Sequence, residues 1–114
     1  MTENEQFVER HIEALLAGDL DQVMQGYQAE AVLRAGGGEH RGRVAVRRHL
    51  EEALESAPDD SRLDYTIATR ADGQVVLTWR LFVAQSVEPV MQGHDEFRFD
   101  EGCIAEQYVE IAGH

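Results

Sequence analysis

The sequence contains no lysine, and its basic residues are far outnumbered by acidic ones. All ten basic side chains are arginine, against 22 aspartate and glutamate residues, and the formal charge is −12. Such a surface repels phosphate groups. We therefore expect neither nucleic acid nor an anionic membrane as a partner.

Cysteine and long apolar runs are scarce as well. Cys103 has no second cysteine with which to form a disulfide or a thiolate metal site. No apolar run approaches the ~18 residues that a membrane crossing needs, and the polar start MTENEQ lacks the basic and apolar regions of a signal peptide. These absences predict a cytoplasmic protein.

The overall composition is that of a globular protein. Apolar residues make up 43% and charged residues 28% of the 114 residues, which is close to the average for folded domains. A chain of this length can close one hydrophobic core without metals or disulfides. We expect a single domain over residues 1–114.

The first half of the chain has mainly helical periodicity. Apolar residues recur every three to four positions from Phe7 to Leu16, from Leu20 to Tyr27 and from Arg43 to Glu55. These patterns predict one long, one short and one further helix. A short strand from Ala31 to Leu33 is predicted between them, followed by a loop at the three glycines 36–38.

In the second half the apolar period changes to two. Alternation over 63–67, 77–83, 91–99 and 104–111 predicts four strands, with glycine-containing turns at 71–73 and 100–102. Helices followed by an antiparallel sheet are typical of the α+β class.

Three segments of the chain are distinctive: Ala17-Gly18-Asp19-Leu20-Asp21 followed by Tyr27, Gly42-Arg43-Val44-Ala45-Val46-Arg47, and His94 to Asp100 with Gly102-Cys103-Ile104. In this order they resemble segments of the nuclear transport factor 2-like superfamily, which includes SnoaL-like and ketosteroid isomerase-like proteins. The resemblance implies a cystatin-like α+β roll, in which a curved, mostly antiparallel sheet wraps three N-terminal helices. Ligands would bind inside the resulting cone.

Asp95 is the main candidate for chemistry. If Phe97 and Phe99 point into the cone, strand alternation places Asp95 on the same face. Burial would then raise its pKa and suit it to act as a general acid or base. The resemblance also places it where ketosteroid isomerases have the aspartic acid of their oxyanion hole. Alternatively, Asp95 only binds a backbone amide, or the alternation is shifted by one residue.

His11 is the second candidate. It lies in the apolar stripe of the first helix, and the resemblance places it where ketosteroid isomerases have an enolate-stabilising tyrosine. A histidine there can bind the same oxygen or exchange a proton with Asp95. The alternative is a core histidine bonded to a carbonyl group or to water.

The sequence departs from its relatives at two positions. Ala35 stands where the isomerases have their aspartate base, and Glu39 is a substitute only if it swings in from the glycine loop. Gly93 stands where limonene-epoxide-hydrolase relatives would have arginine. Neither of these two reactions is therefore supported.

The predicted ligand-binding residues are mostly aromatic. They are Trp79, Tyr65, Phe97, Phe99, Tyr27 and Leu50. Core packing would explain Trp79 and Tyr65 equally well. The histidines lack metal-site spacing, so we expect no metal and no cofactor.

These observations predict a pocket for a small, mostly apolar metabolite, with or without cofactor-free proton-transfer chemistry of the isomerase, cyclase, dehydratase or hydrolase type. The alternative is a non-catalytic module of the same fold. A homodimer through the outer sheet face is expected in either case, because that face carries apolar area. The residues that supply this face are Val76, Thr78, Arg80, Phe82 and Tyr108.

Overall fold

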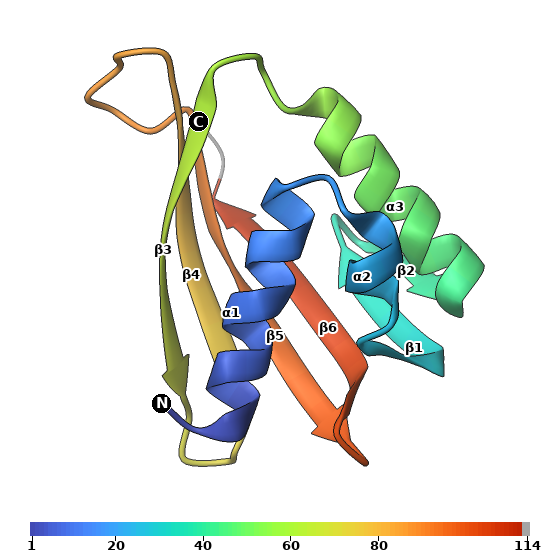
Figure 1. Cartoon of the computed structure of the whole chain (residues 1–114). Coiled ribbons are helices and arrows are strands. Elements are labelled where there is room, and N and C mark those ends of the chain that lie inside the picture. The colour runs from blue at the N-terminus through green and yellow to red at the C-terminus, as the bar shows by residue number, and fades with distance from the viewer. Residues whose placement is uncertain (113–114) are drawn as a thin grey trace.

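The computed structural model describes residues 1–112, which form three helices on one side of a six-stranded sheet (Figure 1). The helices are α1 (Glu3–Leu16), α2 (Leu20–Met24) and α3 (Arg43–Ser56). The strands are β1 (Tyr27–Ala35), β2 (Gly38–Arg41), β3 (Ser61–Thr69), β4 (Val75–Val83), β5 (Met91–Asp100) and β6 (Cys103–Ala112). This curved open sheet with its helices confirms the expected α+β class.

Helix α1 begins before the apolar stripe that predicted it. Its first turn is held by a capping box, in which the hydroxyl of Thr2 accepts from the Glu5 amide at 3.0 Å and the Glu5 carboxylate accepts from the Thr2 amide at 2.9 Å. The helix buries Val8, His11 and Ile12 on one face.

Tyr27 does not continue the second helix as expected, because the chain leaves that helix before Gly26. A side chain at Gly26 would come within 2.6 Å of the Phe7 ring. The close packing of α1 on this turn therefore requires glycine, and Tyr27 becomes the first residue of β1.

The glycine segment forms a tight hairpin between β1 and β2. Gly36 and Gly37 have φ values of 59° and 77°, a region that glycine enters without steric cost. Strand β1 is longer than its apolar residues indicated, and β2 was not predicted. With only four residues, β2 is too short to give a periodic signal.

The sheet order is β2-β1-β6-β5-β4-β3, and all neighbours are antiparallel except β1 and β6. On β5, Asp95 stands opposite Leu77 of β4 and Val109 of β6, and Phe97 stands opposite Val75 and Gln107. These residues share the face of the sheet that the helices cover.

The helices divide that face between them. In Figure 1, α1 crosses the side of the sheet that contains β3 and β4, whereas α3 lies beside β1 and β2. The buried core between these layers consists of Val8, Ile12, Val23, Met24, Tyr27, Ala31, Leu33, Val46, Leu50, Val75, Leu77, Phe97 and Ile104.

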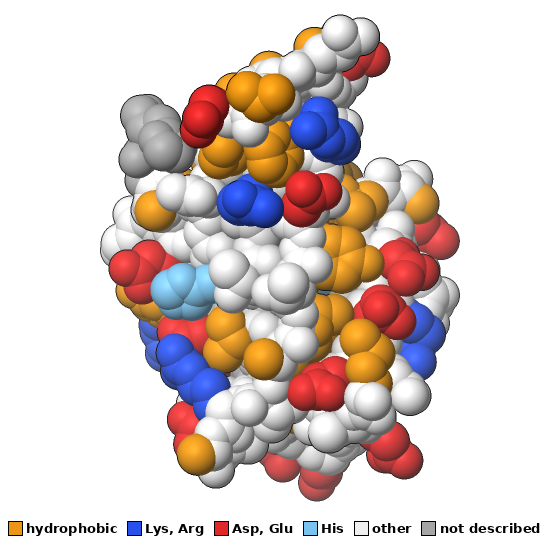
Figure 2. Space-filling model, turned by 90° about the vertical axis from the view of Figure 1, so that its left-hand side faces the viewer, with side chains coloured by type: hydrophobic (Ala, Val, Ile, Leu, Met, Phe, Trp, Pro, Cys, Tyr) orange, Lys and Arg blue, Asp and Glu red, His pale blue; other side chains and the backbone are white. Residues whose placement is uncertain are grey.

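Hydrophobic and charged side chains lie side by side on the surface. Figure 2 shows the side of the molecule that carries the β3 edge, where a band of hydrophobic side chains runs among acidic and basic ones. Within residues 1–112, no helix combines the length and the apolar character needed to cross a membrane.

Candidate functional site

A hollow of about 230 Å³ lies between the sheet and helices α1 and α3. Its walls are mainly apolar, and the polar side chains in them are Asp95, Gln107, Trp79 and His49. The apolar lining consists of Ile12, Leu15, Leu16, Leu33, Leu50, Ala53, Leu54, Leu63, Leu77, Leu81, Met91, Val109 and Ile111.

Three of these lining residues mark the mouth of the hollow. Leu16, Met91 and Ile111 are 52%, 38% and 51% exposed, whereas Leu33 and Leu77 are at most 2% exposed. The hollow therefore opens at residues from the C-terminal end of α1, the start of β5 and the end of β6, and its buried residues include ones on β1 and β4.

Asp95 is held by two N–H donors at the sheet side of the hollow. The indole Nε1 of Trp79 donates to Oδ1 at 3.0 Å, and the amide Nε2 of Gln107 donates to Oδ2 at 2.8 Å. Burial raises the pKa of Asp95, and the two donors offset part of that rise. The carboxylate is thus fixed in place while its affinity for a proton is increased.

Tyr27 fixes the orientation of Gln107. Its hydroxyl is fully buried and donates to Oε1 of Gln107 at 2.5 Å. Burial, together with the nearby charge of Asp95, raises the pKa of Tyr27, so this hydroxyl stays protonated. Because the carbonyl of Gln107 binds Tyr27, its NH₂ group must face Asp95.

His11 lies at the far end of the same chain of contacts. Its Nε2 is 3.3 Å from the hydroxyl of Tyr27. Since that hydroxyl donates its single proton to Gln107, it can only accept from His11, so the imidazole carries its proton on Nε2. Burial lowers the pKa of His11 to about 4. The histidine is therefore neutral near pH 7 and is linked to Asp95 through Tyr27 and Gln107.

Gly93 makes room for the Trp79 ring. A side chain at this position would come within 2.3 Å of the Glu110 carbonyl and 2.9 Å of the indole. Trp79 stands opposite Gly93 in the β4–β5 ladder and reaches the next inward residue of β5, Asp95. Glycine at position 93 thus permits the contact between Trp79 and Asp95.

The predicted site residues occupy three different places. Asp95, Trp79 and Leu50 line the hollow. Tyr27 and His11 lie behind it in the hydrogen-bonded chain. The other three predicted residues are not among those that line it: Phe97 is buried in the core, Phe99 packs edge-on against Phe7, and Tyr65 borders a different hollow.

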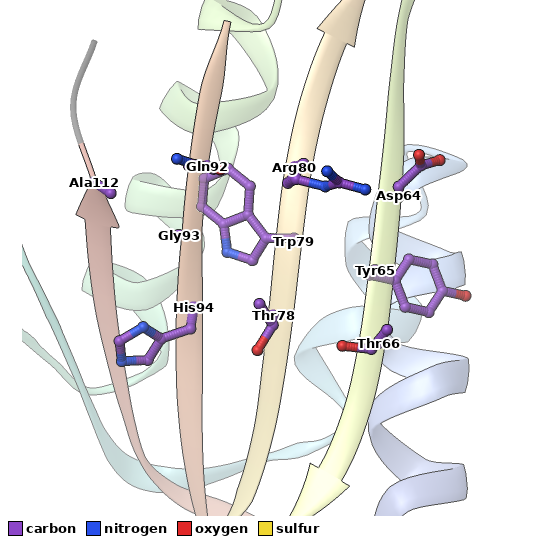
Figure 3. A pocket seen from close by; sticks show the side chains of 10 residues that line it. All are labelled: Asp64, Tyr65, Thr66, Thr78, Trp79, Arg80, Gln92, Gly93, His94 and Ala112. Atoms are coloured by element: carbon purple, nitrogen blue, oxygen red, sulfur yellow. The ribbon is translucent and has the colours of Figure 1, made fainter. Parts of the chain in front are cut away.

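That second hollow lies on the outer face of the sheet and has a volume of about 350 Å³ (Figure 3). Figure 3 views the strands with the helices behind them, and polar side chains such as Thr78, Arg80 and His94 are spread across neighbouring strands. The outer hollow does not include Asp95. The inner hollow is therefore the better candidate site.

Gln107 and His49 are the polar lining residues that sequence reasoning did not assign to the pocket. A signal for Gln107 was present, because it is two residues before Val109 and four before Ile111 on the inward face of one strand. His49 precedes Leu50 on α3 and gives no comparable signal, since a half-buried helix position fits a solvated histidine equally well.

Ala35, which stands at the position of the isomerases' aspartate base, has no substitute base in Glu39. Glu39 is exposed and paired with Arg34 at 3.3 Å and with Arg41 at 3.1 Å, so it is held on the surface of β2. Within the described part of the chain, no group of three or more His, Cys, Asp or Glu side chains is arranged to hold a metal ion.

Comparisons with known proteins agree with this architecture. A putative polyketide cyclase from Sinorhizobium meliloti has 20% identity and a TM-score of 0.76, with 92% of this chain and 94% of that chain covered. Bal32a from a soil-derived mobile gene cassette has 17% identity and a TM-score of 0.80, with coverages of 95% and 88%.

A third similar structure is SalBIII, described as an epoxide hydrolase/cyclase-like enzyme in pyran ring formation in the polyether salinomycin. It has 17% identity and a TM-score of 0.75, with 94% of this chain and 88% of that chain covered. Likeness at these identities establishes the fold only. No curated protein matches the chain. The SnoaL-like domain family, however, matches residues 8–107, and the chain therefore belongs to the SnoaL-like domain family.

Proposed function

We propose that the inner hollow binds a compact, mostly apolar metabolite and that Asp95 acts on it as a general base. The observation that carries this proposal is the pair of N–H donors on the two oxygens of Asp95 in an otherwise apolar hollow. A ligand in this hollow would be surrounded by aliphatic side chains and the face or edge of one indole.

The directions of the hydrogen bonds favour a base over a hydrogen-bond donor. Trp79 and Gln107 both present N–H groups to Asp95, so the carboxylate accepts on both oxygens. A protonated aspartic acid would have to place its own proton next to one of these donors. Asp95 therefore takes a proton from the ligand, and its raised pKa makes that transfer easier.

Proton abstraction and return by one carboxylate need no cofactor. Asp95 takes the proton from a C–H or O–H group of the ligand, or from a water molecule in hydrolysis, and gives it back at the same position, at another position or to a leaving oxygen. This step is common to isomerase, cyclase, dehydratase and hydrolase chemistry. The cyclase descriptions of two structurally similar proteins fit within it.

The second candidate function is binding without chemistry. It is favoured by the fact that both oxygens of Asp95 already have a partner within the protein, as a purely structural carboxylate would. The two functions predict the same occupancy of the hollow and differ only in proton transfer.

An assay that does not require knowledge of the natural substrate separates the catalytic function from binding without chemistry. 2-Tetralone is a compact, apolar ketone with an acidic C–H group beside its carbonyl. We expect the protein to accelerate the exchange of this hydrogen for deuterium in D₂O. Nuclear magnetic resonance measures the rate of this exchange. Replacement of Asp95 by Asn should reduce the accelerated rate by ~100-fold or more, the usual contribution of a general base.

Asp64→Asn is the matched control, because Asp64 is exposed on the outer face and borders only the outer hollow. This variant should exchange 2-tetralone at the wild-type rate. Equal rates for the wild type and Asp95→Asn would exclude Asp95 as the base.

A further inference from the structure

His49 is a polar group of the inner hollow for which the proposed proton transfer has no use. Among the described residues that line the hollow, Asp95 and His49 are the two titratable ones. Asp95 projects from the sheet, on β5, and His49 projects from the helical layer, on α3. The hollow therefore has polar groups on two different walls, separated by aliphatic side chains.

The imidazole ring of His40 packs close to that of His49. The His40 and His49 ring centroids are 4.5 Å apart, with 38° between the ring planes. His40 is on β2, opposite Leu33, which itself lines the hollow. The imidazole of His49 is thus held between the β1–β2 hairpin and the ligand space.

The surroundings of His49 keep the imidazole uncharged. Burial and the adjacent His40 lower its pKa, and Glu52 on the same helix opposes this only in part. A neutral imidazole has one N–H donor and one acceptor nitrogen. It suits a hydroxyl or carbonyl group better than a carboxylate, which a chain of net charge −12 would also repel.

We infer that His49 is a second ligand-binding residue, and that the ligand is a compact, uncharged apolar molecule with an oxygen function at each end, one at Asp95 and one at His49. Hydroxyketones, diketones and diols belong to this class. The volume of the hollow, about 230 Å³, is below the ~300 Å³ at which drug-sized pockets begin, so the two oxygens are separated by one or two rings at most. This inference rests on the proposed function.

The test compares two bicyclic probes that differ by one hydroxyl group. Binding of 2-naphthol and of 2,6-dihydroxynaphthalene is measured by isothermal titration calorimetry at pH 7. In the wild type we expect the diol to bind ~5- to 10-fold more tightly, as expected for one additional hydrogen bond. Asp95→Asn should weaken the binding of both probes.

In His49→Phe the preference for the diol should disappear, apart from the statistical advantage of its two equivalent hydroxyls, and 2-naphthol should bind as in the wild type. His49→Leu provides a second variant if the phenylalanine variant does not give the wild-type circular dichroism spectrum. His94→Phe is the matched control, because His94 is a half-buried histidine on the outer face. It should keep the full preference.

The outcomes separate this inference from the proposed function. If 2-naphthol binding requires Asp95 but the preference for the diol survives in both position-49 variants, the assignment of His49 is wrong and the proposed function stands. If 2-naphthol does not bind, or binds equally well to Asp95→Asn, both the proposed function and this inference are overturned.

Discussion

The indole N–H of Trp79 donates to Oδ1 of Asp95 at 3.0 Å, and Trp79 is the single tryptophan of the chain. The side chain that dominates the intrinsic fluorescence of the protein is therefore hydrogen-bonded to the proposed base. This relationship gives direct access to the ionisation of Asp95.

We predict that the fluorescence of Trp79 titrates with Asp95. The pKa of Asp95 is raised above its ordinary value of 3.8, so the emission should change at a pH above 3.8 as the carboxylate forms. The measurement is an acid-to-neutral fluorescence titration. Asp95→Asn should abolish the transition, and an unaltered transition in that variant would assign it to another group.

The same raised pKa has a consequence for stability. The folded protein holds the proton of Asp95 more tightly than the unfolded chain does. The stability that protonated Asp95 contributes is therefore present at low pH and is lost as the pH rises through the pKa of Asp95 in the folded state. Relative to Asp95→Asn, the wild type should therefore become less stable as the pH rises above 3.8 and through the raised folded-state pKa, as urea unfolding at several pH values would measure.

His11 should have the opposite effect. Its pKa falls from 6.5 to about 4 in the fold, so the unfolded chain takes up a proton that the folded protein does not accept. The stability that neutral His11 contributes is fully present above pH 6.5 and is lost as the pH falls toward 4. The free energy of unfolding falls by about 3 kcal/mol in total over this range. His11→Gln, which can still donate to Tyr27, should reduce this loss in urea unfolding. An equal loss of stability in His11→Gln would show that other groups cause it.

Gly93→Ala should destabilise the protein. The added methyl group would collide with the Glu110 carbonyl and with the Trp79 ring, and the expected cost is ~1–3 kcal/mol. Thermal unfolding provides the measurement. Gly38→Ala is the control, because its nearest contact is at 3.5 Å, an ordinary van der Waals distance. Equal melting temperatures for the two variants would contradict the close approach of β6 to Gly93.

The outer sheet face should mediate a homodimer. Tyr108 on this face is 44% exposed, whereas Phe82 is covered by the guanidinium groups of Arg62 and Arg80. Light scattering should give about twice the 12.8 kDa chain mass at micromolar concentration. Thr78→Arg, which places a charge in the outer hollow, should give a monomer, and Arg48→Glu on α3 should not. A wild-type monomer would refute the prediction.

Hydrophobic periodicity predicted most of the fold because the burial of each element follows from its own spacing. The middle of the strand containing Leu77 and Trp79 alternates between more buried and exposed residues, and α1 has one apolar stripe. Strand β2 and the full length of β1 were not predicted, for two other reasons. Strand β1 pairs with β6, which is distant in sequence and is not signalled by local alternation, and β2, which pairs with β1, has only four residues.

The candidate site was predictable only in part. Alternation along β5 was enough to place Asp95 with the inward residues of that strand, but it carries no information about which side chains reach it. The contact with Trp79 depends on the glycine opposite it, and the contact with Gln107 depends on the hydroxyl of Tyr27 from another strand. Such arrangements are properties of the assembled layers and not of any one segment.

The position of β6 between β1 and β5 has a consequence for biosynthesis. Cys103–Ala112 come after every other strand in the chain, yet they occupy an interior place in the sheet. The two halves of the sheet cannot join until these residues have left the ribosome, so folding by gradual addition of strands during synthesis is not available. Pairings between segments so far apart in sequence also slow the folding reaction.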